Sequence, residues 1–385
     1  MKKIPFLIVI LGIITISCDK ADLSQDENAS SNNVTLQRQS SLFNYIESTQ
    51  INNGVNCENN ILIFPTWDKY WETIEQLDVM IDADCDAFDA TVSGTITDDQ
   101  YDALALAAGF DEDNVLRKFE DDLAFCSLRM KIETLENSWL DQQGDGAWDA
   151  DADPDNHFID DETERALLSQ NAEVMIGDRK TGYVYYKFLD DEGNWIEVHN
   201  GDTNAMTQVS NGTIPSGNPN VVISKPPREE STESCKSKVK RVTYHYDNAN
   251  GKRIKQISKI RREFGANATS QTSVFKGKIK AKTKGYRKKN GKWRGRRTWI
   301  TAGIGGVVVG QPGNAFDACQ SELDPTYKVK ERRRRRVKVK TTINPFVGVL
   351  PTLHYFSVKD NKLYSLHKQG QVLIINADFH DMPID

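Results

Sequence analysis

The chain has 385 residues, enough for about two domains, and a net charge of −6 from 49 Lys and Arg against 55 Asp and Glu. This near-neutral total hides two opposed halves. Residues 1–234 hold 15 basic and 45 acidic residues, a net of −30, whereas residues 235–385 hold 34 and 10, a net of +24. The division excludes a uniformly basic or uniformly acidic protein and indicates two parts of different character.

The N-terminus has the pattern of a bacterial lipoprotein signal. Lys2 and Lys3 precede an apolar run over residues 6–16, which is too short for a stable membrane-spanning helix but typical of a signal peptide. The run ends at Ser17-Cys18, which predicts cleavage before Cys18 and lipidation of its thiol; the alternative is an ordinary signal peptide with an incidental cysteine. Export excludes a nuclear or cytosolic role. No other apolar run is long enough to span a membrane, so we expect no transmembrane helix in the mature chain.

The segment after Cys18 is rich in Ser, Asn, Asp and Gln, so it cannot bury enough apolar surface to fold, and we expect a flexible tether over residues 18–56. Its early acidic residues resemble the acidic export tracts of surface lipoproteins in the Bacteroidetes. In enterobacteria an Asp directly after the lipidated cysteine indicates inner-membrane retention instead. The resemblance implies an outer-membrane, lipid-anchored and cell-surface location.

Residues 57–200 are predicted to form a small acidic α+β domain. A short strand leads into a helix capped by Thr66, whose apolar stripe begins at Trp67 and Tyr70. A second helix is predicted over 115–140 and a shorter one over 160–170. Two alternating runs around residues 190–193 predict a β-hairpin within 175–200.

The segment DADPDNHFIDDE, residues 151–162, matches the spacing of a calcium-binding EF-hand loop. Asp151, Asp153 and Asp155 occupy positions 1, 3 and 5, Glu162 occupies position 12, and His157 would offer its backbone carbonyl. Asn156 replaces the usual turn glycine. The alternative is an acidic surface loop without metal, because an acid-rich region produces such matches by chance.

A linker rich in Gly, Asn, Ser and Pro is expected over residues 201–234, followed by a basic, mostly antiparallel all-β domain over 235–385 with a sandwich or barrel-like form. Asn250-Gly251 and Asn290-Gly291 predict tight hairpins, and segments 361–367 and 370–379 predict the last strands.

Two basic segments of this domain alternate with period two, so we interpret both as β-strands with a cationic outer face. This face predicts a site for a polyanion: acidic polysaccharide, lipopolysaccharide phosphates, extracellular DNA, or the acidic half of the chain itself. The alternative is a solvated face that only blunts a sheet edge. Tyr286, Trp293 and Trp299 lie among the charges and could stack on sugars or bases, although structural packing is the more common role. The residues of the face are Lys276, Lys278, Lys280, Lys282, Lys284, Lys328, Lys330, Arg332, Arg334, Arg336, Lys338 and Lys340.

An exported protein can keep disulfides, and Cys235 with Cys319 are the only cysteines of the basic half, so we expect them to pair. One of Cys57, Cys85 and Cys126 is then left over, and we expect it to be buried.

The acidic half resembles a group of uncharacterised Bacteroidetes surface lipoproteins over roughly residues 57–200. The resemblance lies in FPT at 64–66, LLS at 167–169 and AEVMIGD at 172–178, and it implies no known activity. The histidines fit no hydrolase or phosphate-loop motif. We therefore expect a non-enzymatic binding or structural module; the alternative is a surface hydrolase that uses acidic residues of the N-terminal domain.

Overall fold

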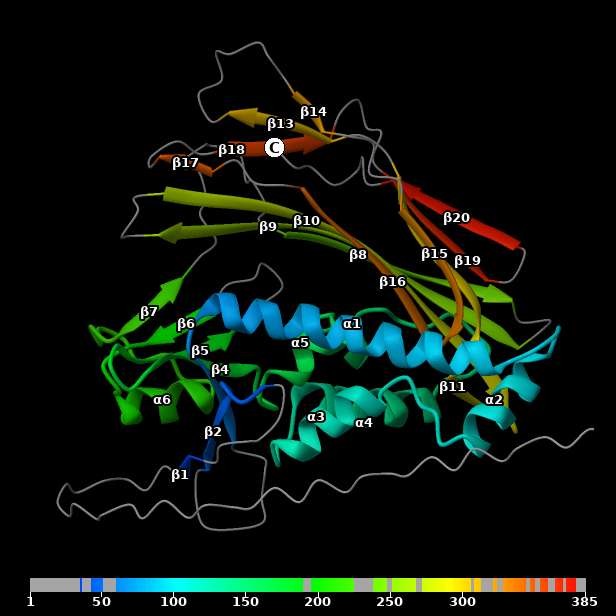
Figure 1. The fold of residues 1–385 in the computed structure, drawn as a ribbon, viewed down its shortest axis with the longest axis horizontal. Coiled ribbons are helices and arrows are strands. Elements are labelled where there is room, and N and C mark those ends of the chain that lie inside the picture. Colours follow the sequence, from blue (N-terminus) through cyan, green and yellow to red (C-terminus); the bar gives the residue numbers. More distant parts are fainter. Residues whose placement is uncertain are drawn as a thin grey trace, which may run out of the picture.

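The computed structural model describes residues 35–36, 43–50, 60–189, 195–224, 238–247, 251–267, 272–305, 308–312, 321–323, 328–343, 347–349, 354–358, 364–369 and 372–378. Its architecture is α+β, with the helices in the N-terminal half and antiparallel sheets in the C-terminal half, as predicted (Figure 1). In this described part no closed barrel is present, so the barrel-like alternative is not found there. None of the helices in these ranges is both long and apolar enough to cross a membrane.

The N-terminal half has one seven-stranded sheet with the strand order β1 to β7. All of its pairings are antiparallel except the parallel pair β3–β4. The β5–β6 pair confirms the predicted hairpin. The strands are β1 (Thr35–Leu36), β2 (Glu47–Gln50), β3 (Ile61–Phe64), β4 (Glu173–Asp178), β5 (Gly182–Phe188), β6 (Trp195–Val198) and β7 (Val221–Ser224).

Helices pack on this sheet. Those of the N-terminal half are α1 (Trp67–Thr91), α2 (Asp98–Ala107), α3 (Asn114–Asp122), α4 (Leu128–Asp141), α5 (Glu162–Ala166) and α6 (Thr203–Ser210). The hydroxyl of Thr66 accepts a hydrogen bond from Lys69 N at 3.2 Å, which confirms the predicted cap of α1. Tyr70 and Leu77 of the predicted stripe are fully buried in the core against the strand residue Phe64.

Several expectations about this half are wrong or incomplete. The flexible tether expected over residues 18–56 is ordered at residues 43–50, where β2 pairs with β3 and Phe43 and Ile46 are buried in the core. The single helix expected over 115–140 is two helices, α3 and α4, because Ala124 adopts a positive φ of 45° and the hydroxyl of Ser127 caps α4 by accepting from Met130 N. Helix α2 was not predicted, although Thr97 and Gln100 form its capping box. The expected linker over 201–234 contains α6 and β7, so the ordered sheet continues to Ser224.

The C-terminal half contains three sheets among the described residues. The largest has the order β11-β10-β9-β8, and β16 and β17 also pair with β10; the others have the orders β15-β12-β19-β20 and β14-β13-β18. The first four strands are β8 (Lys238–Asp247), β9 (Lys252–Asn267), β10 (Thr272–Lys289) and β11 (Lys292–Gly295). The next are β12 (Thr298–Gly305), β13 (Val308–Pro312), β14 (Ser321–Leu323), β15 (Lys328–Arg334) and β16 (Arg336–Ile343). The last are β17 (Val347–Val349), β18 (His354–Val358), β19 (Tyr364–Gln369) and β20 (Val372–Asp378).

The predicted hairpins of this half are confirmed. Asp247 pairs with Lys252 across the β8–β9 turn, and Lys289 pairs with Lys292 across the β10–β11 turn. Asn290 and Gly291 both adopt positive φ, at 53° and 79°, as a tight hairpin of this kind requires. Strands β19 and β20 occupy the two segments predicted to end the chain's sheet structure.

The second basic segment is two strands and not one. Strand β15 pairs with β12, whereas β16 pairs with β10, and the chain changes sheets at Arg335. The backbone N–H of Arg335 donates to both carboxylate oxygens of Glu112, at 3.0 and 3.1 Å. An acidic side chain of the N-terminal half therefore satisfies the backbone group that the break exposes.

Candidate functional site

The acidic segment predicted to bind calcium forms two short capped turns. A 3-10 helix over Pro154–Asn156 is capped by Asp153, whose carboxylate accepts from Asp155 N at 2.8 Å. Helix α5 is capped by Asp161, whose carboxylate accepts from Thr163 N. Asp153, Asp155, Asp160 and Glu162 are buried, which would be costly for carboxylates unless each had a partner of opposite charge.

Lysines of β10, one of the predicted cationic strands, and of its neighbour β9, which was not predicted to belong to the cationic face, supply those partners. Lys255 of β9 lies 2.7 Å from Asp153 and 3.1 Å from Asp155 (Nζ to Oδ2 in both). Lys282 of β10 lies 2.5 Å from Glu162 and also donates to the carbonyl of Asp160 at 3.0 Å. The cationic face is therefore turned inward, onto the acidic half.

The same pattern continues around these pairs. Asp160 takes two lysines, Lys259 at 2.5 Å and Lys280 at 2.7 Å. Lys284 lies 2.6 Å from Glu136 of α4, which also accepts from the hydroxyl of Tyr286 at 2.9 Å. These side chains are all buried, so the contacts are poorly screened by salt.

Ammonium groups thus occupy the positions that the sequence pattern assigned to calcium. Asp153, Asp155 and Glu162 each pair with lysine, and the backbone carbonyl of His157 accepts from Lys240 Nζ at 2.9 Å. Among the residues that the structure describes, no group of three or more Asp, Glu, His or Cys side chains is arranged to hold a metal ion. Asp151 is exposed and forms no ion pair with a described residue. The calcium prediction gains no support from this geometry, because lysines already neutralise these carboxylates, and it stays a prediction.

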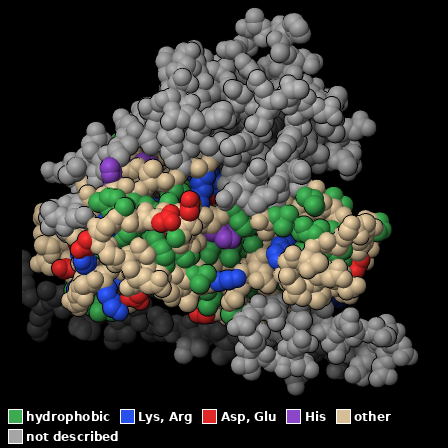
Figure 2. All heavy atoms as spheres, turned by 180° about the vertical axis from the view of Figure 1, so that it is seen from behind, with side chains coloured by type: hydrophobic (Ala, Val, Ile, Leu, Met, Phe, Trp, Pro, Cys, Tyr) green, Lys and Arg blue, Asp and Glu red, His purple; other side chains and the backbone are tan. Residues whose placement is uncertain are grey.

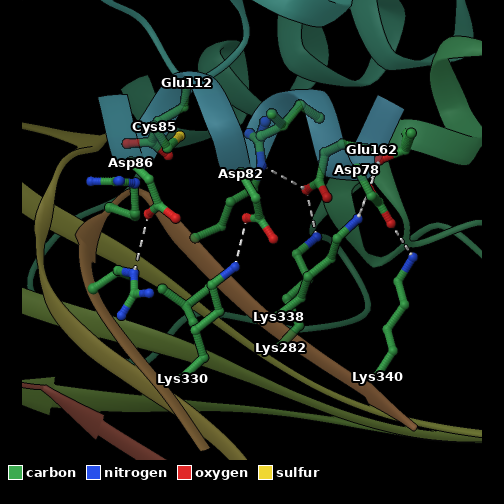
Figure 3. Close-up of a pocket in the computed structure, with 16 residues that line it drawn as sticks. Asp78, Asp82, Cys85, Asp86, Glu112, Glu162, Lys282, Lys330, Lys338 and Lys340 are labelled. Atoms are coloured by element: carbon green, nitrogen blue, oxygen red, sulfur yellow. Dashed lines mark hydrogen bonds and ion pairs between the residues drawn. The ribbon is translucent and has the colours of Figure 1, made fainter. Parts of the chain in front are cut away.

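Helix α1 carries a second series of pairs, of which Figure 3 shows Asp82 with Lys330 between the helix and the strands below it. Asp82 lies 2.6 Å from Lys330, Asp86 lies 3.7 Å from Arg332, and Asp89 lies 2.7 Å from Arg334. Two residues of strand advance by about 6.7 Å and four residues of helix by about 6 Å, so a Lys-x-Lys strand can match an Asp-x-x-x-Asp helix over several steps. We call these three pairs the α1 ladder.

The ladder extends to β16 through Asp78, which lies 2.5 Å from Lys338 and 2.7 Å from Lys340. A cavity of about 240 Å³ lies among these residues, and Cys85 lies on its wall. The apolar stripe of α1 does not reveal the acidic residues on its other face, and these were not predicted as functional: Asp78, Asp82, Asp86 and Asp89. Their spacings of four, four and three residues, which place them on one helical face, were the available signal.

The arginine run also pairs with the acidic half. Arg333 lies 3.2 Å from Asp98, Arg335 lies 2.5 Å from Asp111, and Arg336 pairs with Asp113. The five consecutive arginines are therefore a part of an internal interface and not a solvated basic tail.

Aromatic side chains close one end of this interface. The guanidinium of Arg253 lies 4.4 Å from the ring centre of Trp148 and 4.5 Å from that of Trp293, and its Nη1 donates to the carbonyl of Gly146. Trp293 and Tyr286 are fully buried and pack on Trp148, so both have the structural role. Trp299 remains 45% exposed, with Arg333 at 5.1 Å from its ring centre.

The pKa values follow from burial and from these partners. Burial alone would raise the pKa of Asp155, but Lys255, Lys284 and Lys282 outweigh it and hold the pKa well below its ordinary value of 3.8. Burial acts in the same way on Asp161, and Lys338 and Lys340 outweigh it there. For Glu136 burial wins and its pKa is raised. Burial lowers the pKa of Lys280 to about 8 and that of Lys240 to about 7.

Most of the predicted cationic face thus pairs with carboxylates of the chain's own acidic half, and this half was one of the four candidate polyanions. The expectation of an outward, solvated face is wrong for Lys280, Lys282 and Lys284, which are buried. Lys328 is exposed, and nothing is described of the side chains of Lys276 and Lys278. Figure 2 shows the face turned away in Figure 1, where the charged side chains of the described residues are scattered and gather in no single patch. Binding to an external polyanion stays a prediction.

The cysteines are described in part. Cys85 is free and buried, which confirms the prediction of one buried, unpaired cysteine in this half, and Cys126 is in a disulfide. Burial raises the pKa of Cys85 to about 11. Cys18, Cys57, Cys235 and Cys319 lie outside the described residues, as does the whole signal peptide.

Fold and site together define an α+β protein whose oppositely charged halves are joined by buried ion pairs. No protein-family model and no curated protein matches the chain. One solved structure, a DUF4848 family protein from Bacteroides thetaiotaomicron VPI-5482, is matched over 83% of this chain and 94% of its own, with 9% identity and a TM-score of 0.18. So low a TM-score shows only a faint resemblance and supports no conclusion about fold or function.

Proposed function

We propose that this protein is a lipid-anchored component of the cell envelope that acts as a structural or binding module, with its acidic half serving as the polyanion for its own cationic β face. The observation that supports this most is the meeting of the two sequence motifs: Lys280 and Lys282 of the predicted cationic face pair with carboxylates of residues 153–162, and lysines of the adjacent strand β9 do the same. Neither motif needs a ligand from outside once they are paired.

The buried position of these pairs supports a structural role. Exposed ion pairs contribute about 0–1 kcal/mol each, whereas removal of one partner from a buried pair costs about 3–5 kcal/mol because the other charge is left uncompensated. The two halves therefore hold each other in one arrangement. An external polyanion would first have to displace carboxylates that are present at an effective concentration on the order of millimolar through the intervening chain.

External binding through this face can be tested with the full mature chain. Asp78→Asn with Asp82→Asn removes carboxylates that face Lys330, Lys338 and Lys340, so we expect the double variant to elute from a heparin column at higher salt than the unmodified chain. Asp122→Asn is the matched control, because Asp122 pairs with Lys118 on the surface of α3. Equal retention of all three proteins would contradict the proposal that internal carboxylates compete for the face.

The anchor rests on the basic n-region, the apolar run and Ser17-Cys18. Cys18→Ser should release the protein from the membrane fraction and abolish incorporation of a labelled fatty acid. Unchanged membrane fractionation without lipid label would overturn the anchor. The hydrolase alternative is tested by panels of polysaccharides and peptides, and turnover of any of them by the purified protein would overturn the non-enzymatic proposal.

A further inference from the structure

A second polar groove lies outside the predicted cationic face, where the first turn of α2 meets the β8–β9 and β10–β11 turns. Figure 1 shows α2 at this end of the molecule, where Asp99 and Asp102 of the helix pair with Arg287 of β10. The groove has a volume of about 320 Å³, which is within the range of small-ligand sites. It is lined by Thr97, Asp98, Asp99, Gly251, Lys252, Arg287, Lys288, Lys289 and Arg296.

The lining of this groove is unbalanced in charge. The lining contains five cationic side chains and two acidic ones. Asp102 and Asp145, beyond the lining, pair with Arg287 and Lys288, and Asp98 pairs with Lys252, so Lys289 and Arg296 are the least compensated cations of the groove. Asp99 is shared by Arg287 at 3.0 Å and Lys289 at 3.7 Å. Asp99 is 67% exposed and Lys289 is 54% exposed, so their pair is a weak surface contact that a ligand can displace.

Arg296 differs from the other arginines of this region. Arg287 has Asp99 and Asp102 as partners, whereas Arg296 forms no ion pair with any residue that the structure describes. The Nε of Arg296, like that of Arg287, is buried and has no hydrogen-bond acceptor among the described residues. A buried guanidinium N–H without an acceptor is costly, and an anion in the groove would supply one.

We propose that this groove binds a tetrahedral oxyanion group, the sulfate or phosphate ester of an anionic polysaccharide. Arginine and lysine bind such groups through charge-assisted hydrogen bonds, and a guanidinium can contact two oxygens at once. Arg296 and Lys289 are the principal contacts, with Lys288 and Lys252 at the margins. None of these residues belongs to the predicted cationic face, so the inference goes beyond the proposed function and does not need the face to open.

The test uses calorimetric titration of the full mature chain with a heparin-derived oligosaccharide at low and at physiological salt. We expect binding that weakens as salt rises and a loss of at least about tenfold in affinity in the double variant Arg296→Gln, Lys289→Gln, the loss expected when one charge-assisted contact is removed. Since Arg296 pairs with no described acidic side chain, its replacement removes no described ion pair. Circular dichroism should therefore show the fold unchanged. Lys118→Gln, which removes a charge from a 75% exposed lysine on α3, is the control.

Inorganic phosphate and a carboxylate-only oligogalacturonate complete the set of probes. Inorganic phosphate and inorganic sulfate are each tested as competitors of the heparin-derived oligosaccharide. If phosphate competes more strongly, the ligand group is a phosphate ester, and if sulfate does, it is a sulfate ester; both outcomes support the proposal. Equal affinity of the double variant and the unmodified chain, an equal loss in Lys118→Gln, or equally strong binding of the oligogalacturonate would overturn it. The Asp78→Asn, Asp82→Asn variant separates this site from the main interface, because it should leave the Arg296-dependent part of the affinity unchanged.

Discussion

Lys282→Met removes the ammonium group that neutralises a buried carboxylate at the centre of the interface. Lys282 is 1% exposed, and its Nζ contacts Glu162 at 2.5 Å and the carbonyl of Asp160 at 3.0 Å. After the substitution the nearest remaining cation of Glu162 is Arg336, whose Nε lies 3.7 Å away. Breaking a buried pair on one side costs about 3–5 kcal/mol, so we expect a loss of that size in the free energy of unfolding.

The contribution of the pair itself is obtained from a double-mutant cycle with Glu162→Gln. Because the double variant leaves no uncompensated charge, its loss of stability should be smaller than the sum of the two single losses by about 1–3 kcal/mol. Urea unfolding at pH 7, followed by tryptophan fluorescence, measures all three variants. Lys118→Met, on the surface of α3, should change stability by less than about 0.5 kcal/mol. A loss below about 1 kcal/mol for Lys282→Met, or strictly additive losses, would refute the reasoning.

Three further predictions follow from the same contacts. The pKa values of Asp155 and Asp161 are lower in the folded than in the unfolded chain. Their contribution to the free energy of unfolding is therefore fully present above about pH 5 and is lost as the pH falls below their ordinary pKa of 3.8. Urea midpoints that stay constant from pH 7 to pH 3 would contradict this. Millimolar calcium should leave the melting temperature unchanged, and a rise that Glu162→Gln abolishes would restore the calcium site. Cys85, buried and with its pKa raised to about 11, should react with iodoacetamide only on unfolding, whereas rapid alkylation of the native protein would show that the α1 ladder is open.

The local features of the fold could be predicted from the sequence because neighbouring residues determine them. The cap at Thr66, the hairpin at Asn290-Gly291 and the alternation in residues 276–284 each depend on a few adjacent side chains. The break between α3 and α4 was missed because the apolar period of residues 115–140 continues through it. The interruption depends on the positive φ of Ala124 and on the Ser127 cap, which the period does not reveal.

The site was predicted only in outline. The acidic loop was given calcium as its ligand, and the basic strands were given a polyanion, with the acidic half of the chain as one of four candidates. Their mutual pairing joins residues about a hundred positions apart, such as Asp153 and Lys255, and no local pattern shows that they meet. The opposed charges of the two halves indicated attraction between them, but not which carboxylate meets which lysine. The prediction that the cationic face points outward was wrong for the same reason.

Salt should act unevenly on the pairs of this interface. The pairs around residues 153–162 are buried, so screening should act mainly on the exposed α1 ladder, where Asp82 and Asp86 are more than half exposed. We therefore expect salt to loosen the edge of the interface before its centre.

Zero-length crosslinking by a carbodiimide, followed by mass spectrometry of the proteolysed full chain, tests the pairing of the two halves most directly. The reagent joins a carboxylate to an amine only where the two are in contact, and the exposed pairs Asp82–Lys330 and Asp145–Lys288 are accessible to it. The structure predicts amide-linked peptides that join residues of α1 to β15 and residue 145 to β10, at protein concentrations low enough to exclude links between molecules. Crosslinks confined to each half, with none between residues 78–162 and residues 252–340, would contradict the internal interface.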